Sequence, residues 1–234
     1  MIFRHFVQPV TISKTCLTSY ESFYNLQNAV LIKNGCPPKQ TSNKFEDVRR
    51  EIEKYKQDGD RKVFIHVARF SEPKNQKQLF DTFLQLRDKG CKFLLVVLGA
   101  NYEKSGYINL SNSEDIKILG EKNNVGDYLA CADYFVLTSL WEGLPISLIE
   151  AMSVGCIPIS TPAGGVVDVI RNKENGYITE TFSDDEMYKC IKDIIQGKCC
   201  IDKSKVVDSY NASFTMEICA RNYFALYQNV LDEK

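Results

Sequence analysis

The strongest constraint on the fold of this chain is a regular alternation of short apolar runs with helix-like segments. The run from Phe93 to Leu98 is apolar at every position, as is typical of a strand that is covered on both faces. Repeated alternation of this kind indicates a parallel sheet with helical crossovers. We therefore predict an α/β fold with a doubly wound, Rossmann-like parallel sheet. The expected strands are Lys62–Ala68, Lys92–Leu98, Ile116–Leu119, Tyr134–Thr138 and Cys156–Ser160.

Helical patterns occupy most of the intervals between these strands and continue to the end of the chain. The expected helices are residues 45–57, Gln76–Lys89, Val125–Cys131, Pro145–Val154, Val166–Arg171, Asp184–Gln196 and Phe214–Leu231. Gly90 follows one of them at the position that favours a left-handed residue. The last helix is amphipathic, which predicts that it covers a face of the sheet.

The first 35 residues are less regular. Residues 1–10 read as a short apolar stretch with no turn or partner strand nearby. A short helix is expected at about residues 18–26, with Thr18 or Ser19 as its N-cap. A strand at Ala29–Lys33 should follow and end at the turn dipeptide Asn34-Gly35.

Composition excludes several classes of protein. The 234 residues carry a formal net charge of −1 and no dense block of Lys and Arg, so we expect no nucleic-acid partner. No apolar run approaches the ~20 residues of a transmembrane helix, and the N-terminal stretch is too short and mixed for a signal peptide. We expect a cytoplasmic location. The nine cysteines are scattered without a Cys-x2-Cys pair, which predicts reduced thiols and no metal site.

The segment from Ser139 to Met152 is the main candidate for a binding site. It is expected to form a tight loop and then a helix, with Pro145 at the first helical position. The N-terminus of a helix offers unpaired N–H groups that suit a phosphate or sugar hydroxyls, and Gly143 lets this backbone approach a ligand. Glu142 and Glu150 lie eight positions apart in this segment. The residues alone leave two interpretations open: two acids that face one cleft, or a charge that complements the helix dipole and a solvated helix residue.

The loops after the other predicted strands hold further candidates. Arg69 and Lys74 follow the first strand, and a planar guanidinium combined with a point charge suits a diphosphate. Two ordinary surface cations are the alternative. Gly99, Leu119 and Gly120 lie in short loops that fit either a nucleobase edge or plain tight turns.

Other chemistries lack their motifs. The sequence has no Gly-x-Gly-x-x-Gly after the first strand, no Gly-x4-Gly-Lys-[Ser/Thr] phosphate loop and no Gly-x-Ser-x-Gly elbow. His66 lies inside an apolar run, which indicates a core histidine. Trp141, the single tryptophan, is expected to pack on its loop.

The run Glu-Gly-Leu-Pro-x-Ser-x-x-Glu-Ala-Met from Glu142 to Met152, followed by Gly155-Cys-Ile-Pro and by Gly164-Gly165, resembles the signature of the retaining glycosyltransferases of family four, which have the GT-B fold. The resemblance covers roughly residues 30–232. It implies that the chain is the C-terminal, donor-binding half of such an enzyme. Residues 1–34 would then be a remnant of the N-terminal acceptor domain with its linker, and residues 35–234 the nucleotide-sugar-binding domain.

The resemblance also implies roles for the candidate residues. Glu142, Arg69 and Lys74 would carry the catalysis: Glu142 holds hydroxyls of the transferred sugar, and the two cations stabilise the departing diphosphate without a metal or other cofactor. The expected substrate-binding residues are Glu150, on the ribose hydroxyls, together with Gly143, Leu144, Pro145, Gly99, Leu119 and Gly120. Asp168 stands where the family usually has Glu, and the shorter side chain leaves its role open.

The implied reaction is retaining transfer of a sugar from a UDP- or GDP-sugar donor to a sugar or lipid-linked acceptor, in the synthesis of a cell-surface polysaccharide or glycoconjugate. A peripheral position at the inner face of the membrane is compatible with such an acceptor. One alternative is a non-catalytic nucleotide-sugar-binding subunit that needs an N-terminal-domain partner or forms a homodimer; another is an epimerase or phosphorylase on the same fold. We expect the isolated chain to bind donor but to transfer sugar slowly.

Overall fold

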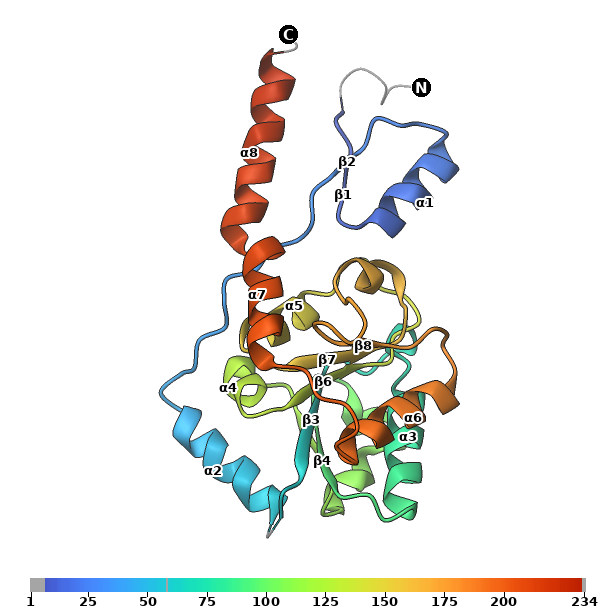
Figure 1. Cartoon of the computed structure of the whole chain (residues 1–234), viewed down its shortest axis with the longest axis vertical. Coiled ribbons are helices and arrows are strands. Elements are labelled where there is room, and N and C mark those ends of the chain that lie inside the picture. Colours follow the sequence, from blue (N-terminus) through green and yellow to red (C-terminus); the bar gives the residue numbers. More distant parts are fainter. Residues whose placement is uncertain (1–6, 58, 233–234) are drawn as a thin grey trace.

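The computed structural model describes residues 7–57 and 59–232. Its main body is a six-stranded, entirely parallel sheet with the strand order β5-β4-β3-β6-β7-β8 (Figure 1). The strands are β3 (Lys62–Val67), β4 (Phe93–Leu98), β5 (Ile116–Gly120), β6 (Tyr134–Leu137), β7 (Ile157–Ser160) and β8 (Tyr177–Ile178). The predicted fold class is confirmed.

Helices cover both faces of this sheet, which explains why its strands are apolar on both sides. All six residues of β4 are buried. One layer contains α3 (Gln76–Asp88) and α6 (Asp184–Ile195), which pack together. The other is a row of four helices: α2 (Phe45–Lys56), α4 (Val125–Ala130), α5 (Ile146–Ser153) and α7 (Lys203–Ser213). Short 3-10 turns, among them η2 (Glu72–Lys74) and η5 (Gly164–Asp168), complete the connections.

A smaller unit lies beyond the carboxyl ends of β6 and β7. It contains β1 (Val10–Thr11), α1 (Lys14–Tyr24) and β2 (Val30–Leu31), and β1 pairs with β2 in parallel. The long helix α8 (Met216–Asp232) leaves the main body on the same side (Figure 1). None of the described residues of α8 is buried.

Several sequence predictions about local structure are wrong. The N-cap of the first helix is Ser13, whose hydroxyl accepts the N–H of Cys16, so the helix begins before Thr18. The first apolar stretch does have a partner strand, β2, although residues 1–6 lie outside the described residues. The predicted helix Val166–Arg171 is the single turn η5, because Gly164 has a positive φ of 53° and β-branched residues follow it.

The fourth error concerns the last helix, which projects from the main body and does not cover the sheet. Pro145 also differs by one position: it is the N-cap residue, and the helix starts at Ile146. The sequence interpretation missed α7 and the two-residue strand β8.

Candidate functional site

The candidate site lies where the connections of the sheet change direction. From β3 the chain moves outward to β4 and β5, and then returns to place β6 on the other side of β3. Ligands of open parallel sheets bind at such a switch point, beyond the carboxyl ends of the strands. Arg69 and Lys74 follow β3, and Glu142 follows β6. The topology therefore brings these three predicted residues together at the carboxyl ends of the strands.

Lys74 and Glu142 are in direct contact. The Nζ of Lys74 donates to Oε1 of Glu142 at 2.6 Å, and the hydroxyl of Ser139 donates to the same oxygen at 2.6 Å. The Glu142 side chain is 7% exposed and that of Lys74 is 24% exposed. A carboxylate this buried needs such charged and hydrogen-bonding partners. Sequence reasoning missed Ser139, although its position three residues before Glu142 was the available signal.

The residues that directly follow β6 hold the backbone around Lys74 in place. The hydroxyl of Thr138 donates to the carbonyl oxygens of Lys74 and Asn75 at 3.2 and 3.0 Å. The N–H of Leu140 donates to the carbonyl of Pro73 at 2.8 Å. These bonds join the turn after β3 to the end of β6, and thereby fix the lysine beside the acid.

A buried polar network supports the loop that carries Arg69. The amide of Gln76 donates to the carbonyl of Arg69 at 2.9 Å, and the hydroxyl of Tyr102 donates to the carbonyl of Ala68 at 3.1 Å. Behind them, the Nδ1 of His66 lies 2.9 Å from the carbonyl oxygen of Val136. Burial lowers the pKa of His66 to about 4, so its ring is neutral at physiological pH and donates from Nδ1. The prediction of a core histidine is confirmed.

The Arg69 side chain itself is exposed, and it has no ion-pair partner among residues 7–57 and 59–232. It is therefore available to a ligand at this edge. Lys74 differs, because its charge is already shared with Glu142.

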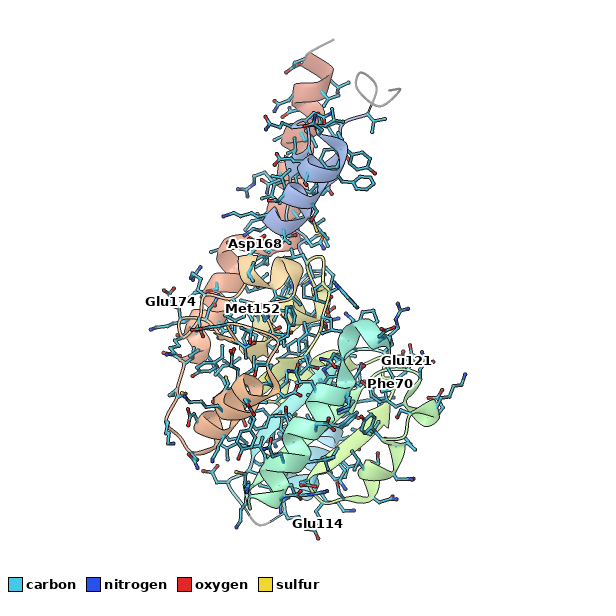
Figure 2. The ribbon with its side chains drawn as sticks, turned by 90° about the vertical axis from the view of Figure 1, so that its right-hand side faces the viewer. Phe70, Glu114, Glu121, Met152, Asp168 and Glu174 are labelled. Atoms are coloured by element: carbon cyan, nitrogen blue, oxygen red, sulfur yellow. The ribbon has the colours of Figure 1, made fainter. Side chains whose placement is uncertain are left out.

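Two glycine loops meet behind Glu142. A Cβ added to Gly164 would lie 1.8 Å from the carbonyl oxygen of Glu142, and one added to Gly165 would lie 1.9 Å from that of Gly143. Only glycine permits this approach of the two backbones. Asp168, at the end of the second loop, accepts the N–H of Lys14 at 2.5 Å and so anchors α1 (Figure 2).

The other predicted backbone positions form two groups. Leu144 and Pro145 are buried at the start of α5, and the carbonyl of Leu144 accepts from the side chain of Asn34 at 3.2 Å. Gly99 donates to the carbonyl of Gly120 at 2.9 Å, and its Cα faces the carbonyl of Ala68 so closely that a Cβ would lie 2.0 Å away. Leu119 is half-buried. The second group thus lies at the ends of β3, β4 and β5, on the Arg69 side of the site.

Glu150 contacts a different segment from Glu142. Its Oε1 lies 2.8 Å from the Nζ of Lys39, in the segment that leads into the main body. The N–H of Lys39 also donates to the hydroxyl of Ser153 at 3.0 Å. The next residues of this segment are held by Asp127 of α4, which accepts the N–H and the hydroxyl of Ser42, each at 2.6 Å. No sequence pattern indicated a role for Lys39, which lies in a stretch that reads as a loop.

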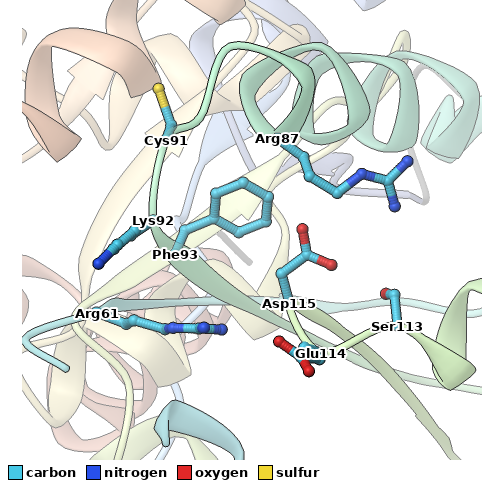
Figure 3. A pocket seen from close by; sticks show the side chains of 8 residues that line it. All are labelled: Arg61, Arg87, Cys91, Lys92, Phe93, Ser113, Glu114 and Asp115. Carbon is cyan, nitrogen blue, oxygen red and sulfur yellow. The ribbon is translucent and has the colours of Figure 1, made fainter. Parts of the chain in front are cut away.

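A second cluster of charged residues lies at the other end of the strands, on the amino-terminal side of the sheet. Arg61, Arg87, Lys92, Glu114 and Asp115 line a pocket of about 290 Å³ (Figure 3). It lies at the amino ends of β3, β4 and β5, away from the switch point. In the described part of the chain, no group of three or more His, Cys, Asp or Glu side chains is arranged to hold a metal ion.

The parallel sheet with an acid and two cations at its switch point defines an α/β domain suited to an anionic, hydroxyl-bearing ligand. Residues 47–212 match the glycosyl transferases group 1 family, and the chain belongs to that family. The resemblance noted in the sequence is confirmed.

Characterised relatives give the context of this family membership. The chain is 28% identical over 181 residues to N-acetyl-alpha-D-glucosaminyl L-malate synthase of Bacillus anthracis, a match that covers 74% of this chain and 47% of that enzyme. It is 33% identical over 128 residues to the capsular polysaccharide biosynthesis glycosyltransferase CapH of Staphylococcus aureus, covering 52% and 34% of the two chains. The match thus spans less than half the length of each of these relatives.

Solved structures share the fold. A glycosyltransferase from Rickettsia africae superposes with a TM-score of 0.80 at 18% identity, over 96% of this chain and 64% of that one. The Anabaena protein HepE, solved in complex with UDP and glucose, gives 0.77 at 18% identity, over 97% and 64% of the two chains. The chain therefore matches about two thirds of each GT-B structure. Among residues 7–57 and 59–232, no helix has the length and apolarity to cross a bilayer.

Proposed function

We propose that this chain is the donor-binding part of a retaining glycosyltransferase that uses a UDP- or GDP-sugar. The observation that carries the proposal is the contact of Lys74 with Glu142 at the switch point of the sheet. In this proposal the lysine binds the diphosphate of the donor and the carboxylate binds hydroxyls of its sugar. The complex of HepE with UDP and glucose supports a nucleotide-sugar as ligand.

The chemistry of the proposed reaction requires stabilisation of the leaving group. As the glycosidic bond to the diphosphate breaks, negative charge develops on the departing oxygens. Arg69, Lys74 and the N-terminus of α5 would stabilise that charge, a kind of contribution that is typically worth several kcal/mol. Glu142 would hold the hydroxyls of the transferred sugar and Glu150 those of the ribose. The resemblance of Glu142–Met152 to the family signature supports the proposed retention of configuration.

The proposed division of the chain follows its two structural units. Residues 35–234 would bind the donor, and residues 1–34 would belong with an acceptor domain. A sugar or lipid-linked acceptor is in keeping with the relatives, which include an enzyme that acts on a diphospho-undecaprenol. The chain spans only part of each relative. We therefore propose, as a separate step, that a whole enzyme containing this chain transfers the sugar to the acceptor.

Calorimetry with UDP and with GDP, in the presence of a chelator, tests the donor site. We expect binding of at least one nucleotide without added metal, because the cations and the helix end supply the positive field. Lys74→Met should weaken binding. The matched control is Lys77→Met, which removes an exposed lysine on α3 that pairs with Asp81. No binding of either nucleotide at millimolar concentration would refute the proposal.

A second measurement separates transfer from the alternatives. The purified chain is incubated with a UDP-sugar, and the products are identified. Free sugar of retained configuration, formed slowly, is expected from a donor site that lacks a bound acceptor. Release of a sugar phosphate together with UDP, seen only when inorganic phosphate is added, would indicate a phosphorylase, and an epimerised nucleotide-sugar would indicate an epimerase.

A further inference from the structure

Two donors converge on one oxygen of Glu142 and leave the other oxygen free. The hydroxyl of Ser139 and the ammonium of Lys74 each lie 2.6 Å from Oε1. In the described part of the chain, no group donates to Oε2. The fully buried side-chain atoms without a partner there are the hydroxyl oxygens of Thr11 and Thr82, so Oε2 keeps access to a ligand. The carboxylate is thus anchored on one side and available on the other.

The first donor, Lys74, is the mobile one. Its side chain is long and flexible, and it is 24% exposed, compared with 7% for that of Glu142. In the proposed function its ammonium binds the diphosphate of the donor. The positive charge that holds Oε1 in the free chain is then shared with the phosphates or drawn away by them. A bound donor therefore weakens this contact at the moment when the sugar needs the carboxylate.

The second donor, Ser139, is fixed in place. Ser139 is 0% exposed, and its carbonyl accepts the hydroxyl of Thr161 at 2.6 Å. Thr161 is also 0% exposed, and its N–H donates to the carbonyl of Leu137 at 3.1 Å. These bonds tie the residue after β6 to the residue after β7. The hydroxyl of Ser139 therefore reaches Oε1 from a part of the backbone that a diphosphate does not touch.

We propose that Ser139 is a positioning residue, which keeps the carboxylate of Glu142 turned towards the transferred sugar when Lys74 turns to the diphosphate. This inference rests on the proposed function. A serine hydroxyl has a single proton, and Ser139 donates it to Oε1, so it acts on the sugar only through the acid. A carboxylate held in this way meets the sugar hydroxyls with Oε2 already oriented, which lowers the entropic cost of binding.

Calorimetry on the whole chain compares the affinity for the nucleotide with the affinity for its sugar conjugate. The probes are UDP and UDP-glucose, or GDP and GDP-glucose if only GDP binds. The ratio of the two affinities isolates the contribution of the sugar. Ser139→Ala should lower this ratio about five- to twenty-fold, because the carboxylate loses the hydrogen bond that orients it. A general disturbance of the fold would weaken both ligands alike and leave the ratio unchanged.

Two further variants separate the hydrogen bond from packing. Ser139→Cys fills nearly the same space with a weak donor, so the ratio should fall nearly as far, and this variant supplies the comparison if Ser139→Ala does not fold. Ser160→Ala is the matched control. Ser160 is also 0% exposed, and its hydroxyl donates to the carbonyl of Thr161 at 2.9 Å. Its removal should cost similar stability in urea unfolding and leave the ratio unchanged.

A double variant tests whether Ser139 acts through Glu142. In the Glu142→Ala chain no carboxylate remains to be positioned. Adding Ser139→Ala to that chain should therefore change the ratio by less than about two-fold. A further loss as large as the one in the original chain would mean that Ser139 contacts the sugar itself, which would overturn the positioning role.

The remaining outcomes separate this inference from the proposed function. An unchanged ratio in Ser139→Ala, in a chain that still binds UDP, would overturn the inference and leave the donor site intact. A full ratio in Ser139→Cys would assign the effect to packing, and an equal loss in Ser160→Ala would assign it to general weakening. Either result would also overturn the inference. If the original chain binds neither UDP nor GDP, the proposed function itself fails.

Discussion

The ammonium of Lys39 and the carboxylate of Glu150 form an ion pair, with Nζ 2.8 Å from Oε1, that ties the segment entering the main body to α5. The Glu150 side chain is 19% exposed, so its charge is only partly solvated. If ribose hydroxyls bind Glu150, they must compete with this lysine or share the carboxylate with it. The ion pair therefore offers a direct test of the role assigned to Glu150.

The first prediction concerns the strength of this pair. A double-mutant cycle of Lys39→Met and Glu150→Gln should give a coupling of about 0.5–1 kcal/mol in the free chain, as is usual for partly exposed pairs. In saturating UDP the coupling should fall towards zero, because the hydroxyls take over the carboxylate. Urea unfolding of the four proteins, with and without UDP, measures both values. A coupling that UDP leaves unchanged would argue against a ribose role for Glu150.

The second prediction separates the two acids. Glu150→Gln should weaken the binding of UDP itself by ~1.5–3 kcal/mol, since it removes a charged hydrogen-bond acceptor. Glu142→Gln should leave UDP affinity nearly unchanged and weaken only the intact UDP-sugar. Calorimetry with both ligands makes the comparison. If each variant loses the same affinity for both ligands, the two roles have been assigned wrongly.

The third prediction concerns the contact between the glycine loops. Gly164→Ala would place a methyl group against the carbonyl of Glu142, at a residue with a φ of +53°. We expect a loss of about 2–3 kcal/mol in the free energy of unfolding, together with weaker UDP-sugar binding, because the loop of Glu142 must move.

Gly106→Ala is the control for this change. Its added methyl group would meet no atom within 4 Å, so a change of less than about 0.5 kcal/mol is expected. Chemical denaturation measures the stability of both variants. Equal, small effects at Gly164 and Gly106 would show that the two loops do not touch in solution.

The fourth prediction is a pH dependence that arises from His66. Burial lowers its pKa from 6.5 to about 4 in the folded chain. The unfolded chain therefore takes up the proton first as the pH falls. The stabilising contribution is complete above about pH 6.5 and is lost between pH 6.5 and 4, by up to about 3 kcal/mol.

Urea unfolding across that range measures this loss. Independently, the imidazole resonance of His66 should not titrate until about pH 4, and a His5→Gln variant assigns the signal. A His66 resonance that titrates near pH 6.5 would contradict the burial described here.

The sequence was most informative where one physical rule acts over several residues. The strand at Phe93–Leu98 was readable because every position is buried, and the places of Arg69 and Glu142 followed from the rule for parallel sheets. Strand β8 has only two residues, too few for a periodic pattern.

Contacts between distant residues were not predictable in the same way. The Lys74–Glu142 pair joins positions 68 residues apart, and it depends on β6 returning beside β3. Nothing in a stretch of Pro, Lys and Gln indicates that Lys39 reaches Glu150. The role of Asp168 stayed open in the sequence, and its contact with the N–H of Lys14, 154 residues away, could not be read from it.

The chain enters the main body near Cys36 and leaves it towards α8 near Phe214, and these two passages lie side by side. The N–H of Cys36 donates to the carbonyl of Phe214 at 3.0 Å, and Gly35 lies so close to Thr215 that an added Cβ would be 2.3 Å from its carbonyl oxygen. The segment that enters the main body and the start of α8 are therefore bonded to each other, so a displacement of one of them must carry the other with it.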